Sequence, residues 1–420
     1  MKAVLPMKRQ TVTVAAPPAK AYTLRALVLA SLAEGTSRVR NPLMGQDQIH
    51  LIGCLKSLGA QIVEDGADLL VTGCAGKYHP QQEELNAGES GVTMNFLSSL
   101  SALCDKEVVL TGKEGLLKRP IGEVISGIHQ LGGKATYLNK EGFPPVRIHP
   151  SPLKGGETTM SGAKTSQYFS SLVISGALTE EETTIICSDE MSERPYFDIT
   201  TSMMEKFGVK TDNRDYKRMT IPAGQSYKAC DIAVEGDFSS ATFFFIAAAV
   251  CGKSVTVTGL NRESVQGDRE ILPLLEKMGC KVEWSGDAVT LTAGPLKAIK
   301  ADGTDIPDMV PSLAVAAAFA EGESVFTGVG RLRYKECDRL EAIRSNLEMM
   351  GCQVCYDDDN IYIQGGSKLH GAEINSFNDH RIAMAFAAAG LAVEGQLIGE
   401  PGCVSKSFPD FWERFAPFQE

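Results

Sequence analysis

The sequence lacks any apolar run long enough to cross a membrane. The run at 241–250 stops after about ten residues, half of what a spanning helix needs, and is typical of a buried helix. The first residues lack the basic-then-apolar order of a secretory signal, and no low-complexity tract interrupts the chain. We therefore expect a soluble, cytoplasmic protein without a membrane partner.

Metal-ligand clusters are missing as well. The 6 histidines and 11 cysteines are scattered, which is typical of reduced, buried thiols rather than a disulfide framework. Cys352 and Cys355 have the spacing of a redox motif, but they lie in a strand-like stretch with no second ligand pair nearby. We expect both to be packing residues, and we expect no metal and no cofactor.

The sequence also lacks an excess of positive charge. The net charge of -11 argues against non-specific nucleic-acid binding, so no nucleic-acid partner is expected. Against this acidic balance, any local cluster of lysine and arginine becomes more significant. At 420 residues the chain is too long for one ordinary core, which predicts two domains.

The sequence does contain a unit that recurs six times, at intervals of about 70 residues. Each copy begins with a run of small apolar residues, followed by a polar or glycine break and a β-rich piece. A helix that is apolar on every side is buried on every side, so we expect these runs inside the fold, shielded by sheets. Five copies continue into an amphipathic segment, expected outside, that ends in a hydrophobic residue and glycine. These endings are Leu58-Gly59, Leu131-Gly132, Phe207-Gly208, Met278-Gly279 and Met350-Gly351.

Six such copies predict an α/β (α+β) protein with two domains of three copies each. The sixth copy ends without its closing strand, and we expect Gln10–Ala15, with alternating Val12 and Val14, to supply it. The N-terminus then belongs to the C-terminal domain. The predicted domains are 19–229, and 1–18 together with 230–420.

Cations recur where the apolar helices begin, and helix N-termini favour anions. Lys20 and Arg25 lie at the first of these helices. Further basic sites fall between the helices, at 117–120, 333–339 and 405–409. Any one of them is more simply a surface turn or an exposed helix start. Their recurrence at equivalent points predicts cation-rich domain ends that suit substrates with phosphates and carboxylates.

Motifs along essentially the whole chain resemble the enolpyruvyl transferase family. The matching segments are Lys20 to Arg25, Arg119-Pro120-Ile121-Gly122, Ser166-Gln167, Pro195-Tyr196, Glu235-Gly236-Asp237, Lys335-Glu336-Cys337-Asp338-Arg339, Asp379 to Met384 and Lys406-Ser407-Phe408-Pro409. The resemblance implies six βαβαββ-type repeats, three per domain, in an inside-out α/β barrel with the active site in the interdomain cleft. It also implies a monomer without a cofactor.

The branch of the family that acts on shikimate 3-phosphate fits best. This resemblance implies transfer of the enolpyruvyl group of phosphoenolpyruvate to the 5-hydroxyl of shikimate 3-phosphate. Phosphate is released by addition and then elimination, as a step of the shikimate pathway toward chorismate and the aromatic amino acids. Such chemistry needs a base for the hydroxyl and an acid for the methylene carbon, and both proton movements are then reversed.

The resemblance assigns roles residue by residue. Asp308 takes the hydroxyl proton, Glu336 handles the methylene proton and Lys20 assists as acid or base. Phosphoenolpyruvate is held by Lys20, Gly91, Arg119, Gln167, Arg339, Arg381 and Lys406. Shikimate 3-phosphate is held by Ala21, Arg25, Thr165, Ser166, Gln167, Ser192, Tyr196, Asp308 and Lys335, and His380 lines the site. No metal is implied, because the cationic side chains neutralise the phosphates. Copy four, with its 237–240 segment, is expected to be scaffold.

Several positions depart from the family pattern. Ala21 stands where many members have serine, Glu89-Ser90-Gly91-Val92 replaces the usual Asn-Ala-Gly-Thr turn, and Asn95 stands in place of an arginine. Ser192 is assigned to the substrate, although strict alignment places Glu193 at that position. A lost neutral hydrogen bond costs about 0.5–1.5 kcal/mol, which weakens binding without abolishing chemistry.

Three alternatives stay open. The family branch that acts on UDP-N-acetylglucosamine typically carries a reactive cysteine in a mobile loop, but the loop at 113–119 has none. A non-catalytic paralogue that keeps the shell for binding is compatible with Ala21 and Asn95. The more distant RNA 3'-phosphate cyclases share related repeats, but their nucleotide-site features are not found here.

Overall fold

The computed structural model describes residues 1–420, and the chain divides into two compact units. Unit 1 contains Met1–Ala19 and Glu235–Glu420, and unit 2 contains Lys20–Val234. The chain therefore passes from one unit to the other twice. No helix in either unit combines the length and the apolar character that spanning a bilayer demands.

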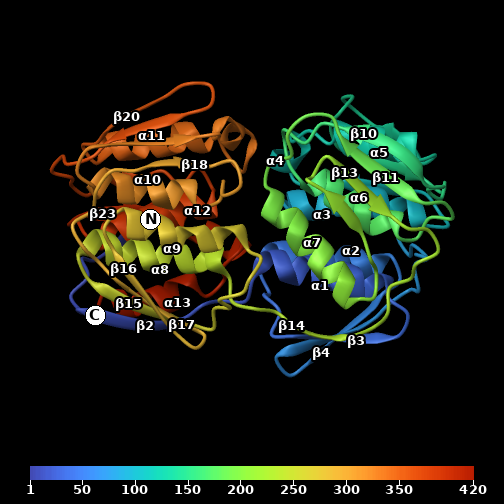
Figure 1. Ribbon diagram of the computed structural model, residues 1–420, viewed down its shortest axis with the longest axis horizontal. Helices are drawn as coiled ribbons and strands as arrows, with labels where there is room; N and C mark the ends of the chain where they lie inside the picture. Colours follow the sequence, from blue (N-terminus) through green and yellow to red (C-terminus); the bar gives the residue numbers. More distant parts are fainter. The chain divides into compact units, whose positions relative to one another are not determined.

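Unit 2 consists of three four-stranded sheets around buried helices (Figure 1). Its helices are α1 (Lys20–Leu32), α2 (Gln46–Ser57), α3 (Gly91–Leu100), α4 (Glu114–Leu117), α5 (Gly122–Gln130), α6 (Gln167–Gly176) and α7 (Arg194–Lys206). Its strands are β3 (Thr36–Arg40), β4 (Gln61–Asp65), β5 (Asp68–Thr72), β6 (Glu84–Asn86), β7 (Val108–Thr111), β8 (Lys134–Tyr137), β9 (Val146–His149), β10 (Gly156–Met160), β11 (Thr183–Cys187), β12 (Asp212–Arg214), β13 (Arg218–Ile221) and β14 (Asp231–Ala233). The sheet orders are β14-β3-β5-β4, β6-β7-β9-β8 and β10-β11-β13-β12.

Unit 1 repeats this plan. Its helices are α8 (Phe238–Cys251), α9 (Ile271–Lys277), α10 (Val310–Phe319), α11 (Arg339–Met349), α12 (His380–Gly390) and α13 (Phe411–Phe415). Its strands are β1 (Lys2–Val4), β2 (Thr11–Ala15), β15 (Ser254–Thr258), β16 (Lys281–Ser285), β17 (Ala288–Thr292), β18 (Lys300–Asp302), β19 (Glu323–Thr327), β20 (Gln353–Tyr356), β21 (Ile361–Gln364), β22 (Glu373–Ile374) and β23 (Gln396–Ile398). The sheet orders are β16-β17-β15-β2, β18-β19-β21-β20 and the three-stranded β1-β23-β22.

The apolar runs form the buried helices that the sequence predicts. In unit 1, α8, α10 and α12 pack against one another, and Figure 1 shows them side by side. Every residue of α12 is buried, as is nearly all of α8 and α10. In unit 2, α3 packs on α6, and α1 is buried from Tyr22 to its end between α2 and α7. Alanine-rich helices suit this position because small side chains let neighbouring backbones approach closely.

The hydrophobic-Gly endings close the amphipathic helices. The five glycines have φ between 83° and 109°, in the left-handed region that glycine enters without steric cost. A glycine here ends the helix and turns the chain into the next strand, while the preceding hydrophobic residue is fully buried. This local chemistry explains why the ending recurs in each complete copy.

The structure corrects the predicted closing strand of the sixth copy. Gln10–Ala15 does not supply it, because β2 pairs in parallel with β15 of the fourth copy, and Val12 is opposite Val255. The strand that completes the sixth sheet is β1, which pairs antiparallel with β23 from Lys2 opposite Ile398. Both N-terminal strands therefore belong to unit 1.

The second crossing also lies later in the chain than expected. Strand β14 precedes α8 in sequence but pairs in parallel with β3 of unit 2, with Ile232 opposite Val39. The boundary consequently follows Val234 rather than residue 229. Strand β2 precedes α1 of copy one but joins the sheet of copy four, whereas β14 precedes α8 of copy four but joins the sheet of copy one. Copies one and four have thus exchanged their first strands.

The cysteines follow the sequence interpretation with one exception. All 11 are free, and Cys352 is buried as expected. Cys355 is exposed rather than packed, because alternate side chains of the outer strand β20 face away from the core.

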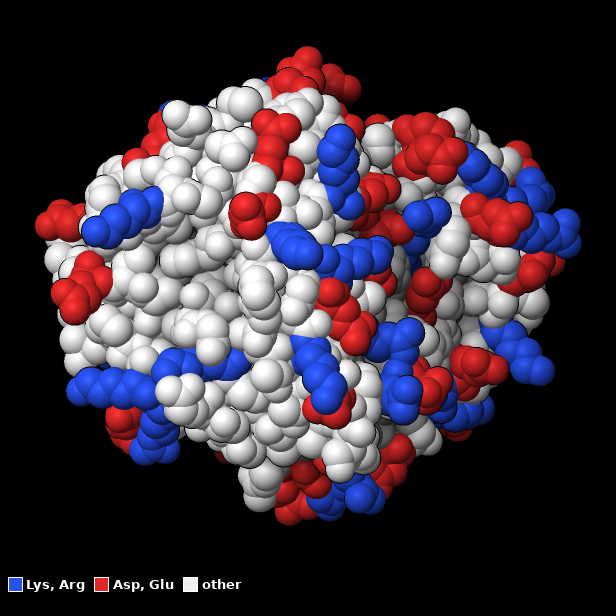
Figure 2. Space-filling view, turned by 60° about the vertical axis from the view of Figure 1, so that its left-hand side comes forward, with Lys and Arg blue, Asp and Glu red and all other residues white.

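Charges of both signs are mixed on the face drawn in Figure 2. Lysines and arginines there lie among aspartates and glutamates, and neither sign forms a continuous patch over that face. Several predicted substrate cations are instead buried, among them Arg25, Arg339, Arg381 and Lys406.

Candidate active site

The starts of α10, α11 and α12 bring charged residues of unit 1 together. Asp308 lies in the turn before α10, and Glu336 lies in the loop before α11. Arg339 is the first residue of α11, and Arg381 is the second of α12. Asp379 caps α12 by accepting a hydrogen bond from the backbone N–H of Arg381 at 2.8 Å.

Arg339 links three carboxylates although it is only 1% exposed. Its Nη1 is 2.9 Å from Asp308 Oδ1, its Nη2 is 2.9 Å from Glu336 Oε2, and its Nε is 2.8 Å from Asp379 Oδ2. Burial alone would lower the pKa of this guanidinium, but the three carboxylates outweigh burial and raise its pKa well above the usual value. Arg339 therefore stays charged and fixes the positions of Asp308 and Glu336 relative to each other.

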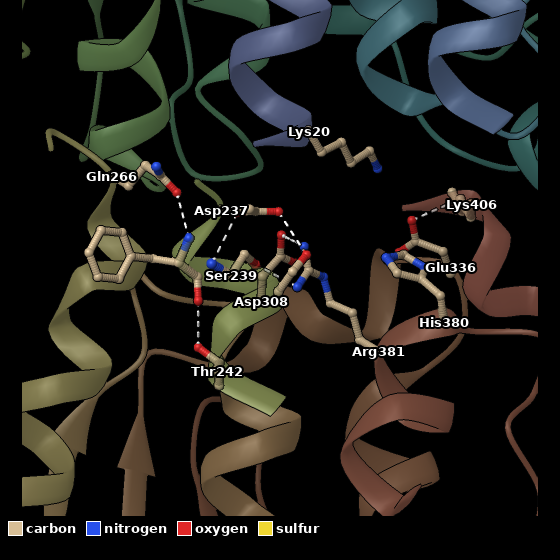
Figure 3. Close-up of polar contacts among 12 residues, drawn as sticks. Lys20, Asp237, Ser239, Thr242, Gln266, Asp308, Glu336, His380, Arg381 and Lys406 are labelled. Atoms are coloured by element: carbon tan, nitrogen blue, oxygen red, sulfur yellow. Dashed lines mark hydrogen bonds and ion pairs between the residues drawn. The ribbon is translucent and has the colours of Figure 1, made fainter. Parts of the chain in front are cut away.

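Two further cations complete what we call the unit 1 network, of which Figure 3 labels Asp308, Glu336, Arg381 and Lys406. Arg381 Nη2 lies 2.8 Å from Asp308 Oδ2, and its Nη1 donates to Ser239 Oγ at 2.6 Å. Lys406 Nζ lies 2.7 Å from Glu336 Oε1. The unit 1 network consists of Asp308, Glu336, Arg339, Asp379, Arg381 and Lys406.

The arginines control the ionisation of Asp308. Burial would raise the pKa of this carboxyl group, but the positive charges of Arg381 and Arg339 prevail and hold its pKa well below the usual range. Lys335 acts on it in the same direction. Asp308 is therefore a carboxylate at neutral pH, and so is able to accept a proton.

His380, predicted to line the site, is the first residue of α12 and is buried. Its Nδ1 lies 3.8 Å from Asp379 Oδ1, so the ring lies against the carboxylate that holds Arg339.

In unit 2 three of the predicted phosphoenolpyruvate residues lie at the starts of buried helices, and the fourth, Arg119, lies between α4 and α5. Lys20 is the first residue of α1, and its Nζ forms a 2.6 Å ion pair with the buried Asp47. Gly91 is the first residue of α3, and a Cβ at this position would lie 3.2 Å from Arg119 Nη1. Glycine thus leaves room for this guanidinium beside the N–H groups of a helix N-terminus.

Gln167, the first residue of α6, is tied to α3. Asn95 Nδ2 donates to Gln167 Oε1 at 2.8 Å. Asn95, a departure from the family pattern, thereby orients the glutamine amide so that its NH₂ group points away from Asn95.

Arg25 is buried in unit 2, and its donors are directed to protein atoms. Nε donates to Thr200 Oγ1 at 2.7 Å, Nη1 to the carbonyl of Ala21 at 3.0 Å and Nη2 to the carbonyl of Tyr196 at 2.8 Å. Burial lowers the pKa of Arg25 to about 10, which still leaves it charged at neutral pH. It therefore joins the start of α1 to the start of α7.

The hydroxyl groups assigned to shikimate 3-phosphate surround Glu193. Thr165 Oγ1 donates to Glu193 Oε2 at 2.7 Å, and Ser166 Oγ donates to the Glu193 carbonyl at 2.9 Å. Ser192 Oγ donates instead to the carbonyl of Gly162 at 3.0 Å. Glu193, and not Ser192, is thus the residue in contact with Thr165 and Ser166.

Sequence reasoning missed the residues that hold the cations. Asp47, Asp379 and Ser239 were given no role, and copy four was assigned to scaffold although its Ser239 contacts Arg381. The signal available for Asp379 was its place directly before an apolar helix, typical of an N-cap. No group of three or more His, Cys, Asp or Glu side chains is arranged to hold a metal ion.

Comparison of the fold identifies the class of protein. The solved structure of EPSP synthase from Acinetobacter baumannii superposes with a TM-score of 0.82 at 28% identity, covering 99% of this chain and 97% of that one. A second structure of EPSP synthase from that organism superposes with a TM-score of 0.81 at 27% identity, covering 98% of this chain and 97% of that one. The chain therefore has the two-domain enolpyruvyl transferase fold.

Comparison of the sequence narrows this class to one family. The family model of EPSP synthase (3-phosphoshikimate 1-carboxyvinyltransferase) matches residues 4–415. The 3-phosphoshikimate 1-carboxyvinyltransferase of Methanoculleus marisnigri is 40% identical over 400 residues, which cover 95% of this chain and 94% of that protein. The 3-phosphoshikimate 1-carboxyvinyltransferase of Photobacterium profundum is 38% identical over 408 residues, which cover 96% of this chain and 95% of that protein. This chain belongs to the EPSP synthase family and is a transferase.

Proposed function

We propose that this chain transfers the enolpyruvyl group of phosphoenolpyruvate to the 5-hydroxyl of shikimate 3-phosphate and releases phosphate. Beside the family membership, one observation carries the proposal: Arg339 holds Asp308 and Glu336 together, each within 2.9 Å of the guanidinium. A pair of fixed carboxylates next to further cations suits two proton transfers on anionic substrates.

In the addition step, the substrate hydroxyl oxygen attacks C2 of phosphoenolpyruvate and Asp308 takes the hydroxyl proton. The methylene carbon C3 gains a proton, handled by Glu336, and becomes a methyl group. The result is a tetrahedral intermediate that carries the phosphate on C2. Lys20 assists as acid or base.

In the elimination step, the methyl group returns a proton, and the C2–O bond to phosphate breaks. The electron pair of that bond leaves with phosphate, which takes up the proton that came from the hydroxyl, and the new double bond between C2 and C3 gives the enol ether product. Atoms and charges balance without a redox partner, and the reaction needs only proton transfer and stabilisation of the leaving phosphate.

Arginine pairing explains how substrate binding activates Asp308. As long as Arg381 and Arg339 pair with Asp308, its low pKa makes it a weak base. A phosphate or carboxylate that draws Arg381 away removes positive charge from Asp308 and raises the pKa of this carboxyl group. The base therefore gains strength when the anionic substrate is present.

The substrate-binding residues that we propose are those predicted from the sequence. Phosphoenolpyruvate is assigned to Lys20, Gly91, Arg119, Gln167, Arg339, Arg381 and Lys406. Shikimate 3-phosphate is assigned to Ala21, Arg25, Thr165, Ser166, Gln167, Ser192, Tyr196, Asp308 and Lys335, and His380 lines the site. The cytoplasmic location and the monomeric state stay predictions from the sequence.

Phosphate release tests the proposed reaction. The protein is incubated with phosphoenolpyruvate and either shikimate 3-phosphate or UDP-N-acetylglucosamine, and inorganic phosphate is measured. We expect release only with shikimate 3-phosphate. Release only with the nucleotide sugar would overturn the substrate assignment, and ligand binding without release from either mixture would favour a non-catalytic paralogue.

Glu193 provides a test of the acceptor site. Its carboxylate, 2% exposed, engages Thr165 Oγ1 and places negative charge beside hydroxyls assigned to a phosphate ester. We expect Glu193→Gln, which removes the charge at constant volume, to lower KM for shikimate 3-phosphate about tenfold, since a desolvated like charge is removed.

The matched control is Glu190→Gln, an exposed glutamate in the same loop that pairs with Lys217. It should leave KM unchanged. A higher KM in Glu193→Gln would instead mean that Glu193 orients Thr165 for the substrate.

A further inference from the structure

An amide side chain lies inside unit 2 at a position where packing alone would favour an apolar residue. Asn95 is the fifth residue of α3, is only 7% exposed and lies between Met94 and Phe96, which are both buried. Burial of an amide is unfavourable unless its polar atoms find partners, and asparagine is also a weak helix former. Its partner is Gln167, whose Oε1 accepts a hydrogen bond from Asn95 Nδ2 at 2.8 Å.

The packing of α3 on α6 holds this pair of amides together. Ser171, one turn after Gln167 on α6, donates to the backbone carbonyl of Asn95 at 2.6 Å. Ser99, one turn after Asn95 on α3, donates to the carbonyl of Ser171 at 2.8 Å. Both contacts between side chains, Asn95 with Gln167 and Ser99 with Ser171, join positions 72 residues apart. The two helices therefore share one register, in which the amide of Asn95 meets that of Gln167.

The contact with Asn95 occupies one half of the Gln167 amide. Gln167 is half-buried, and its backbone N–H donates to Thr165 Oγ1 at 3.3 Å. Its side chain accepts from Asn95 through Oε1. A glutamine amide accepts at the oxygen and donates at the nitrogen, so a donor placed at Oε1 leaves the NH₂ group for other acceptors. The oxygens of a phosphate or a carboxylate are acceptors of this kind.

We propose that Asn95 is a positioning residue for substrate binding: its donor at Oε1 selects the orientation of Gln167 in which the NH₂ group faces the anionic substrate. The inference rests on the proposed function, which assigns Gln167 to both substrates. A glutamine amide turned by half a rotation would direct its oxygen at the same anion and repel it. Where the family pattern has arginine, this chain thus uses an oriented neutral donor in place of a positive charge.

Two substitutions of similar volume separate orientation from packing. Asn95→Leu offers neither donor nor acceptor, so the Gln167 amide loses its preferred orientation. We expect the Kd of shikimate 3-phosphate to increase about three- to tenfold, the range for a neutral hydrogen bond. Asn95→Asp only accepts, so Gln167 turns its NH₂ group to the new carboxylate and its oxygen to the substrate. We expect an increase of about a hundredfold, because the reversed amide and the added negative charge both oppose an anion.

The test is calorimetric titration of the full chain with shikimate 3-phosphate, which needs no turnover. Each substitution at position 95 is made in the wild type and in Gln167→Leu. If Asn95 acts through Gln167, Asn95→Leu should change Kd by less than about twofold in the Gln167→Leu background. Asn95→Asp should also lose most of its effect there, and the remainder measures the direct effect of its charge.

Equal losses of affinity in both backgrounds would overturn the inference, because a merely structural role of Asn95 does not depend on Gln167. An unchanged Kd in Asn95→Leu would overturn it as well. The aspartate variant has nearly the shape of the native side chain, so it decides the question on its own if the leucine variant does not fold.

Ser99→Ala is the matched control. It breaks the other side-chain contact between α3 and α6 but leaves Asn95 and Gln167 in place. Its Kd should stay within about twofold of the wild type, while its Tm reports the lost helix contact. A loss of affinity as large as that of Asn95→Leu would contradict the inference, since helix contact and not amide orientation would then set the affinity.

The wild type itself separates the two levels of the proposal. A wild type that binds shikimate 3-phosphate with the same Kd as Asn95→Leu and Asn95→Asp would overturn the role of Asn95 alone. A wild type that binds no shikimate 3-phosphate would overturn the proposed function, and the inference with it.

Discussion

Asp308→Asn is expected to lower kcat about a thousandfold, the usual loss when a general base is removed. The amide has nearly the same shape as the carboxylate but cannot take the hydroxyl proton. KM for phosphoenolpyruvate should stay the same or decrease, because Arg381 and Arg339 each lose an anionic partner at 2.8 and 2.9 Å. Steady-state kinetics with phosphate detection measures both quantities.

Asp302→Asn is the matched control for this variant. Asp302 is exposed at the end of β18, in the same stretch of chain before α10, and accepts a hydrogen bond from Thr304 that asparagine can keep. It should retain wild-type kinetics. Equal losses of kcat and of substrate binding in Asp308→Asn would show that Asp308 only holds the arginines and is not the base.

Arg339→Met is expected to cause the largest loss of stability, about 3–5 kcal/mol in free energy of unfolding, together with loss of activity. The reason is the position of its partners: Asp308, Glu336 and Asp379 would stay close together in the interior with one cation fewer, since only Arg381 and Lys406 still pair within the network. Urea denaturation followed by circular dichroism measures the change.

This loss should depend on pH with a definite sign. Without Arg339, the network holds three carboxylates against two cations, and proton uptake relieves this excess of buried negative charge, so folding costs more as the pH rises above the carboxyl pKa values of the unfolded chain near 4. The variant should therefore recover part of its stability between about pH 7 and pH 5. A loss that stays constant over this range would mean that lost packing, and not uncompensated charge, destabilises the variant.

Arg344→Met on the same helix is the control. Arg344 pairs with Glu341 and Glu348 on the surface of α11, where the solvent already screens the charges. The expected cost is about 0–1 kcal/mol.

Much of the fold could be predicted because its signals are local. The hydrophobic-Gly endings, such as Leu58-Gly59, mark a helix end and a left-handed glycine within one turn of chain. The alanine-rich runs mark helices without a polar face. The exchange of β2 and β14 between copies one and four could not be predicted, because short alternating strands fit equivalent sheets equally well and pairing is decided over a long range.

The candidate site has the same limit. Its cations can be predicted because lysine and arginine stand out at the start of an apolar helix. Their partners cannot, since the ion pair of Arg339 with Asp379 spans 40 positions and leaves no mark in the local sequence. The contact of Glu193 with Thr165 likewise joins two loops 28 positions apart.

The central claim is that the two carboxylates held by Arg339 carry out addition followed by elimination. The most direct test is to run the reaction with phosphoenolpyruvate and shikimate 3-phosphate in D₂O and to record the mass of the enolpyruvyl product. Addition creates a methyl group that includes one solvent deuterium, and elimination then removes one of its three hydrogens. The claim predicts product that carries deuterium in its methylene group. Product formed at the normal rate without any deuterium would contradict it.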